Sequence, residues 1–259
     1  MKIKETATII SQECLSTGIY SMWLETGIAA SAAPGQFVSV YSNNAARLLP
    51  RPISICEIGN DSIRIVYRVL GKGTDEFSHM TKGDKLEVIG PNGNGFFAAA
   101  GEEIREDSKA LLIGGGIGIP PMLELAKQLK CDVTVVAGYR SAGEMFLTRD
   151  LEKAAKLFVA TDDGSFGTHG TVIDAINAES LEADIVFACG PKPMLKGVKA
   201  LAGRKNIPAY ISTEERMACG VGACLGCVIA STKTDDHSKV NNKRVCADGP
   251  VFAASEVEL

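Results

Sequence analysis

Short hydrophobic runs with intervening polar positions recur along residues 1–100, a pattern typical of β-strands. Turn-forming groups such as Pro34-Gly35 and Gly59-Asn60-Asp61 separate the runs. The predicted strands cover residues 3–10, 19–25, 36–41, 53–58, 63–69 and 85–89. A short helix is predicted over residues 75–80. Several short strands at this spacing favour a closed antiparallel β-barrel.

The pattern changes over residues 101–212, where apolar strands alternate with amphipathic helices. Predicted strands cover residues 110–113, 132–138, 157–160, 184–189 and 208–213, and predicted helices follow Pro121 and cover 149–156, 171–178 and 191–202. Such alternation predicts an α/β, doubly wound parallel sheet. Ligands of such sheets bind beyond the carboxyl ends of the strands.

Glycine-rich or polar segments stand at those predicted carboxyl ends. They are 114–118, 138–140, 161–164 and 189–191. The loop from Gly114 to Gly118 approximates a dinucleotide-binding fingerprint but lacks its third glycine, so a plain strand-to-helix turn stays open as an interpretation. Arg140 does not decide between NAD and NADP, because no acidic residue ends the second strand.

Residues 213–259 form a third, small predicted domain that contains four of the eight cysteines. Cys219, Cys224 and Cys227 have the spacing C-x4-C-x2-C, and Cys246 follows after a polar stretch, residues 232–242, predicted to be a hairpin turn or an exposed loop. This is the plant-type ligand spacing of a 2Fe-2S cluster. The sequence therefore predicts an iron–sulfur site.

Two other interpretations of these cysteines remain. Structural zinc sites prefer repeated C-x2-C pairs, and only one such pair is present. Disulfides suit small secreted chains, and no secretory signal is recognisable. Of the remaining cysteines, Cys14, Cys56 and Cys131 lie in or beside apolar strand-like segments, so buried inert thiols are expected there.

Two segments of the predicted barrel have the chemistry of an anion site. Arg51-Pro-Ile-Ser54 opens a strand with a guanidinium and a hydroxyl, which together suit a phosphate or pyrophosphate. The segment from Tyr67 to Thr74 ends a strand in a glycine-rich turn and offers backbone N–H groups. A surface arginine and a structural turn are the alternatives.

Composition narrows the class of protein. The 259 residues are 46% hydrophobic and 22% charged, with a formal net charge of −4. There is no basic field to hold nucleic acid, and the apolar runs are too short to cross a membrane. With a strand-like N-terminus and no signal peptide, a cytoplasmic protein is expected.

Together these motifs resemble the ferredoxin–NADP reductase superfamily. The features are Arg51-Pro-Ile-Ser54, the loop Gly114–Pro121, Cys189-Gly-Pro191 and the C-terminal cysteine loop. The arrangement is most similar to the electron-transfer subunits of NAD-dependent dihydroorotate dehydrogenase B, notably over residues 213–227 and 245–252. The resemblance covers essentially the whole chain.

The resemblance implies a role for each matching residue. Those implied to hold FAD are Arg51, Pro52, Ile53, Ser54, Tyr67, Arg68, Val69, Gly73 and Thr74. Those implied to hold NAD are Gly114, Gly115, Gly116, Gly118, Cys189, Gly190 and Pro191. Cys219, Cys224, Cys227 and Cys246 would ligate the cluster.

The resemblance also implies a relay in pyrimidine (UMP) biosynthesis. A hydride from NADH carries two electrons, a 2Fe-2S cluster takes one at a time, and a flavin between them mediates. The implied partner is an FMN-containing dihydroorotate dehydrogenase catalytic subunit, in a heterotetramer of two copies of each. Alternatives are the reductase subunit of a ferredoxin:NADP transhydrogenase or of a sulfide dehydrogenase, and a redox-sensing binding protein.

Overall fold

The first six strands close into an antiparallel barrel. The computed structural model describes residues 2–234 and 239–259. Around the barrel the order is β1-β2-β5-β4-β3-β6. The strands are β1 (Ile3–Ser16), β2 (Ile19–Glu25), β3 (Phe37–Val40), β4 (Arg51–Ile58), β5 (Ser62–Arg68) and β6 (Lys85–Asn92). Each predicted run overlaps one of them, and their inward side chains, including Met22, Ile55 and Ile65, form the barrel core.

One helix in this part begins earlier than its sequence pattern predicts. The helix predicted over residues 75–80 is α1 (Lys72–Ser78). The hydroxyl of Thr74 accepts hydrogen bonds from the backbone N–H groups of Leu70 and Gly71, at 3.0 and 3.3 Å. Because this cap forms inside the glycine-rich turn, the turn itself becomes the first turn of the helix.

A seven-stranded sheet follows, in the order β10-β9-β8-β7-β11-β12-β15. Its strands are β7 (Lys109–Gly115), β8 (Asp132–Tyr139), β9 (Lys156–Thr161), β10 (Thr168–His169), β11 (Ile185–Cys189), β12 (Ala209–Ser212) and β15 (Val251–Ala253). All pairings are parallel except that of β12 with β15. The predicted doubly wound sheet is therefore confirmed.

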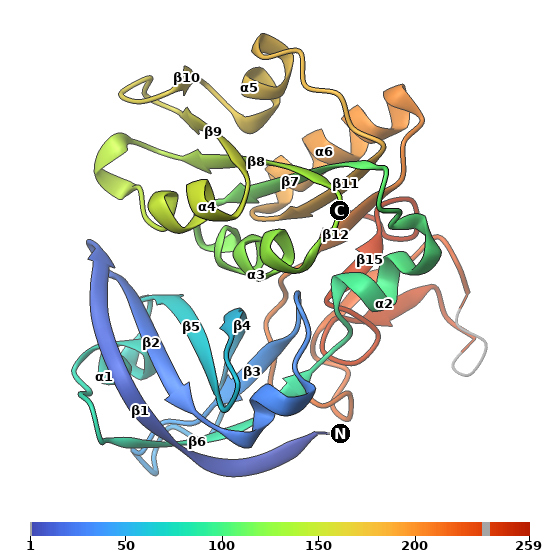
Figure 1. The fold of residues 1–259 in the computed structure, drawn as a ribbon. Helices are drawn as coiled ribbons and strands as arrows, with labels where there is room; N and C mark the ends of the chain where they lie inside the picture. Colours follow the sequence, from blue (N-terminus) through green and yellow to red (C-terminus); the bar gives the residue numbers. More distant parts are fainter. Residues whose placement is uncertain (1, 235–238) are drawn as a thin grey trace.

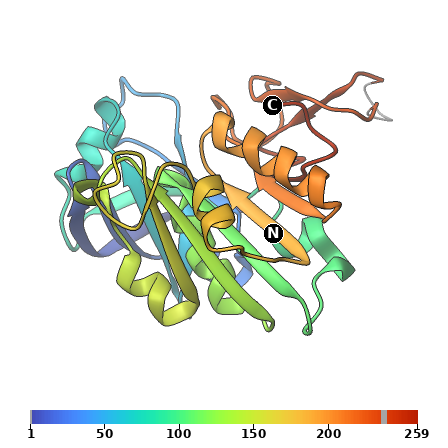
Figure 2. The same cartoon turned by 90° about the horizontal axis from the view of Figure 1, so that it is seen from above.

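Helices cover both faces of this sheet (Figure 2). On one face lie α3 (Pro120–Gln128) and α4 (Thr148–Ala154), and on the other α5 (Val172–Ala178) and α6 (Lys192–Lys205). A further helix, α2 (Phe96–Ala100), links the barrel to the sheet, and short 3-10 turns are η1 (Gly27–Ser31), η2 (Gly101–Glu103), η3 (Gly116–Gly118) and η4 (Ala142–Glu144). In the described part of the chain, no helix has both the length and the apolar character needed to cross a membrane.

The barrel and the sheet share one hydrophobic core. Ile19, Cys56 and Val66 lie on the outside of the barrel and belong to the same buried cluster as Met122 and Leu125 of α3. In Figure 1 the blue-to-cyan barrel lies below the green α3, against which β4 packs. This continuity fixes the two parts relative to each other.

The C-terminal segment is anchored to the edge of the sheet. Two short strands, β13 (Val228–Ala230) and β14 (Asn242–Arg244), form a hairpin, and the predicted loop over 232–242 lies partly outside the described residues. Residues 245–248 form a turn, in which the Asp248 carboxylate accepts a 2.8 Å hydrogen bond from the Arg244 backbone N–H. Only β15 continues as a strand, and Phe252 pairs with Ile211 of β12.

Candidate redox site

A cavity of about 570 Å³ opens at the carboxyl ends of the parallel strands. The predicted strand ends converge there: the loop after β7, Gly138 to Arg140 after β8, Asp162 after β9, and Gly190 and Pro191 after β11. Helices α5 and α6 supply further wall residues, among them Thr171, Val172, Pro193 and Met194. The geometry is that of a nucleotide cleft in a doubly wound sheet.

The glycine loop after β7 leaves no room for a side chain at Gly114, Gly115 or Gly118. A Cβ atom on Gly118 would lie 2.2 Å from the carbonyl oxygen of Cys189, and one on Gly115 would lie 2.5 Å from the sulfur of Met194. Gly116 adopts a φ of +52°, which also favours glycine. The loop is therefore pressed onto the segment after β11, and its backbone forms the wall of the cavity.

Arg68 is a barrel residue that lines this cavity. It ends β5, lines the cavity beside Gly116 and Ile117, and has a buried Nε atom with no hydrogen-bond partner among the described residues. A buried guanidinium N–H without an acceptor is costly, and an anionic ligand would satisfy it. The orphaned nitrogen thus fits a dinucleotide phosphate or a polar flavin edge between barrel and sheet.

Cys189 lies at the end of β11 and is buried. Burial raises the pKa of its thiol, the nearby Glu214 carboxylate adds to the effect, and a hydrogen bond with Ser212 opposes it. Glu214 itself lines the cavity. Gly190 and Pro191, which follow Cys189, line the cavity, and a neutral, buried thiol behind them is unsuited to nucleophilic chemistry.

The barrel residues predicted for FAD occupy two kinds of position. Arg51 lies at the surface, where its Nη1 donates to the Leu49 carbonyl oxygen at 2.6 Å, and a Cβ on Gly73 would lie 1.9 Å from its Nε. Tyr67, by contrast, is buried among the barrel core residues, and its hydroxyl donates to Gln12 Oε1 at 3.0 Å.

The other predicted residues lie on the same strands and turn. Pro52, Ile53 and Ser54 follow Arg51 in β4, and Val69 leaves β5 with its N–H bonded to the Gly18 carbonyl oxygen at 2.8 Å. For all of these residues, a role toward FAD stays a prediction.

The four cysteines of the C-terminal loop lie near one another. The Cys219 thiol interacts with that of Cys224, and the Cys246 thiol interacts with those of Cys227 and Cys219. In the described ranges no three Cys, His, Asp or Glu side chains converge as they would around one ion. Four cysteines with this spacing would supply two thiolate ligands for each of two bridged irons.

Backbone N–H groups point at these sulfurs. The N–H groups of Val221, Gly226 and Cys246 each lie 3.4 Å from a sulfur, those of Cys219, Cys224 and Cys227 respectively. Burial acts to raise the pKa of Cys219, but hydrogen bonds from the loop backbone and from Cys224 lower it to about 6. Burial and the neighbouring Cys227 raise the pKa of Cys246 to about 12. The N–H donors thus favour the thiolate, the form that binds iron, at Cys219, whereas burial and Cys227 oppose it at Cys246.

The cysteine loop packs against the barrel on one side and is bonded to Arg244 on the other. Gly220 has a φ of +67°, and a Cβ there would lie 2.7 Å from the buried Ser39 hydroxyl of β3. Behind the loop, Arg244 donates to the Gly222 carbonyl oxygen at 3.2 Å and forms an ion pair with Asp248 at 2.8 Å. A cluster held here would lie next to the barrel wall.

Sequence reasoning missed several residues of the site. Phe146, Thr171 and Met194 come from loops and helices whose approach to the cavity depends on tertiary packing, so no local signal marks them. Asp162 was not missed, because it lies in the segment 161–164 that the sequence analysis placed at the ligand edge. Ser39 could not have been found, because nothing in its strand pattern indicates contact with a distant glycine.

Two family models match the chain. The iron-sulfur cluster binding domain of dihydroorotate dehydrogenase B matches residues 214–258, and the oxidoreductase NAD-binding domain matches residues 112–200. The first range contains all four cysteines, and the second contains the glycine loop and Cys189.

Solved structures with similar folds agree with the two domain matches. The structure of an NADH-dependent reduced ferredoxin-NADP oxidoreductase is 29% identical with a TM-score of 0.85, and the match covers 97% of this chain and 89% of that one. A ferredoxin NADP+ reductase from Neisseria gonorrhoeae has the same fold, at 16% identity and a TM-score of 0.67, over 82% of this chain and 94% of that one. Fold and site together define an oxidoreductase of the ferredoxin–NADP reductase class with an added iron–sulfur segment.

Curated relatives identify the family within that class. The chain is 46% identical to a protein from Geobacillus kaustophilus over 99% of both chains, and 40% identical to one from Streptococcus mutans over 100% of both. A relative from Listeria monocytogenes is 41% identical over 97% of both chains. This chain belongs to the family of electron transfer subunits of dihydroorotate dehydrogenase B (NAD(+)).

Proposed function

We propose that this protein passes electrons between NADH and an FMN-containing dihydroorotate dehydrogenase catalytic subunit, through FAD and a 2Fe-2S cluster, in pyrimidine biosynthesis. The observation that carries the proposal is the set of four neighbouring cysteines, three of them approached by backbone N–H groups, in a loop that lies against the barrel. The full-length identity with electron transfer subunits supports the same function.

The residues of this chain bind and align, and none needs to act as an acid or base. Arg51 and Arg68 supply cations for FAD, the glycine loop lets the NAD pyrophosphate approach the backbone, and Cys189 lies beside the nicotinamide. When bound, FAD supplies the conversion from two-electron to one-electron transfer and the cluster supplies the outlet. The shared core of barrel and sheet keeps these sites in fixed register.

The partner and compartment follow from the same proposal. The chain itself supplies binding sites for electron carriers, and dehydrogenation of dihydroorotate is assigned to the catalytic subunit, in a heterotetramer of two copies of each. The thiolate ligands require a reducing environment, which supports a cytoplasmic location.

The test is an anaerobic affinity purification from the native host. We expect an FMN protein to co-purify, and the complex to reduce orotate with NADH. The matched control is the complex with Cys224→Ser, which should keep FAD and lose transfer. Loss of orotate reduction in that control, with reduction in the unmodified complex, would support the relay. A native complex that leaves orotate untouched would refute the assignment of substrate.

A second candidate is the reductase subunit of a ferredoxin:NADP transhydrogenase. It is favoured by the similarity to an NADH-dependent reduced ferredoxin-NADP oxidoreductase, at 29% identity. The same purified complex distinguishes the two, because a transhydrogenase would reduce ferredoxin or NADP+ and would leave orotate unchanged.

A further inference from the structure

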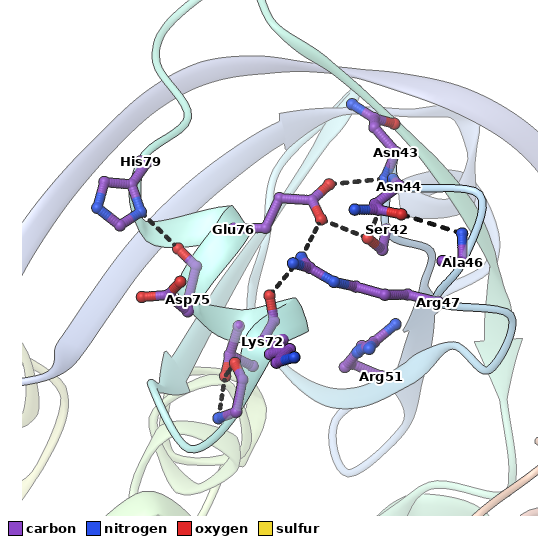
Figure 3. A network of polar contacts seen from close by, with 12 residues as sticks. Ser42, Asn43, Asn44, Ala46, Arg47, Arg51, Lys72, Asp75, Glu76 and His79 are labelled. Carbon is purple, nitrogen blue, oxygen red and sulfur yellow. Dashed lines mark hydrogen bonds and ion pairs between the residues drawn. The ribbon is translucent and has the colours of Figure 1, made fainter.

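The connection between β3 and β4, which we call loop 42–50, is bonded at several points to a single carboxylate. Glu76 of α1 accepts hydrogen bonds from the Ser42 hydroxyl and from the Asn43 backbone N–H, the latter at 2.7 Å. Its Oε2 also forms an ion pair of 2.5 Å with Arg47 Nη1 (Figure 3). Three parts of the loop are thus tied to one residue.

The same arginine ties the far end of the loop to the start of α1. Arg47 Nη1 donates to the Lys72 carbonyl oxygen at 2.5 Å, so one guanidinium bridges loop and helix. Glu76 and Arg47 are half-buried, with side chains 20% and 25% exposed. Ion pairs at this depth are screened less than surface pairs and have a defined geometry.

Loop 42–50 leads into Arg51, whose side chain is constrained by two contacts. Arg51 follows it directly, donates to the Leu49 carbonyl oxygen at 2.6 Å, and lies so close to Gly73 that a Cβ there would lie 1.9 Å from its Nε. Arg51 is therefore positioned from two sides, by the loop carbonyl and by the helix turn. Glu76 and Arg47 connect those two sides, because Arg47 belongs to the loop and Glu76 to the helix.

The loop also presents apolar side chains to solvent. Leu48 and Leu49 are 80% and 56% exposed and are separated from Arg51 only by Pro50. Two exposed leucines beside the Arg51 cation form an amphipathic surface. Such a surface matches a ligand with an apolar ring and a phosphate. FAD is such a ligand, and it is the one implied for Arg51.

We propose that Glu76 is a positioning residue for FAD: with Arg47 it locks loop 42–50 onto α1 and so holds the Arg51 guanidinium over Gly73, where it meets the cofactor. This inference rests on the proposed function for its ligand. It assigns no contact with FAD to Glu76 itself. The effect of Glu76 on binding therefore passes through Arg51.

A double-mutant cycle on the full-length, cluster-containing protein tests this. The dissociation constant of FAD is measured anaerobically from the fluorescence of released flavin. We expect Glu76→Ala to weaken FAD binding about tenfold and Arg51→Ala by about tenfold or more, as for the loss of hydrogen bonds to a charged group. The double variant should bind no more weakly than Arg51→Ala alone, because both changes remove one interaction.

The matched control is Glu87→Ala, which removes the barrel ion pair with Lys4 outside the loop. It should leave FAD affinity unchanged, and cluster absorbance should be normal in every variant. Should Glu76→Ala fail to fold, Arg47→Gln breaks the same pair from the loop side and should show the same non-additivity with Arg51→Ala.

Each outcome decides the matter. A normal FAD affinity in Glu76→Ala, or losses that add in the double variant, would overturn the positioning role alone. A normal FAD affinity in Arg51→Ala would overturn both this role and the assignment of Arg51 in the proposed function.

Discussion

Replacing Arg64 by methionine should destabilise the protein strongly, because this arginine joins the barrel to the nucleotide-binding sheet. Its Nη1 lies 2.5 Å from Glu57 of β4 and 3.1 Å from Asp150 of α4, and its Nε donates to the Ser21 hydroxyl at 2.8 Å. Its side chain is 8% exposed. Methionine keeps much of the length and the apolar stem but removes every polar contact.

The magnitude follows from what remains after the change. Removing one partner of a buried ion pair costs about 3–5 kcal/mol, because the other charge stays buried. Here Glu57 keeps a second cation, Lys127 of α3, and Asp150 is 36% exposed and can rehydrate. We therefore expect the lower end, about 3 kcal/mol. In a chain of this size that corresponds to a fall in Tm of about 6–12 °C.

The assay is thermal unfolding of the FAD- and cluster-loaded protein, followed by circular dichroism under anaerobic conditions. Asp150→Asn is the matched control, because it removes one partly exposed contact and should cost about 1 kcal/mol or less. If Arg64→Met melted no lower than Asp150→Asn, the contacts of Arg64 would not hold the two parts together, and the reasoning would be refuted.

Four further outcomes are expected. Cys224→Ser should lose the cluster but keep FAD, which iron analysis and the flavin spectrum would report; full iron content would contradict the ligand assignment. Gly118→Ala should weaken NADH binding about tenfold or more while FAD binding stays normal, because its Cβ would lie 2.2 Å from a carbonyl oxygen, and titration with NADH checks this. Cys14 is exposed, so the expectation of a buried thiol there is wrong, whereas Cys56 is buried and burial raises its pKa. A thiol reagent at pH 8 should therefore label Cys14 and spare Cys56 until unfolding. Burial acts to raise the pKa of Glu76, but its bonds to loop 42–50 lower it below 4.5, so the stability that it adds over Glu76→Gln should persist above that pH and vanish as the pH falls through the lowered value, as urea midpoints would show.

Local patterns predicted most of the architecture, because strand alternation and metal-ligand spacing are encoded in adjacent residues. The barrel strands, the alternation of strands and helices, and the cysteine set all have this local character. The glycine loop was only partly predictable. Its glycine at 118 is required because the carbonyl oxygen of Cys189, far along the chain, leaves no room for a Cβ there.

Features that depend on distant packing could not be read from the sequence. The unpaired Nε of Arg68 is recognisable only once β5 lies against the glycine loop. The same is true of Arg64, whose partners come from β4, α4, β2 and β1. Tyr67 was expected to line FAD, yet its place in the barrel core reflects the strand's inward face, and its role stays a prediction.

The pairing of β15 with β12 sets a limit on how such proteins can be recombined. A cut at residue 213, where the sequence suggests a boundary, would separate Ile211 from Phe252, which pair across the two strands. A cluster segment taken from a homologue would therefore bring its own β15, which would have to pair with β12 of the recipient. The sheet and the cysteine loop must therefore be exchanged together, and, although the barrel closes within its own six strands, its outer face has to match the sheet with which it shares a core.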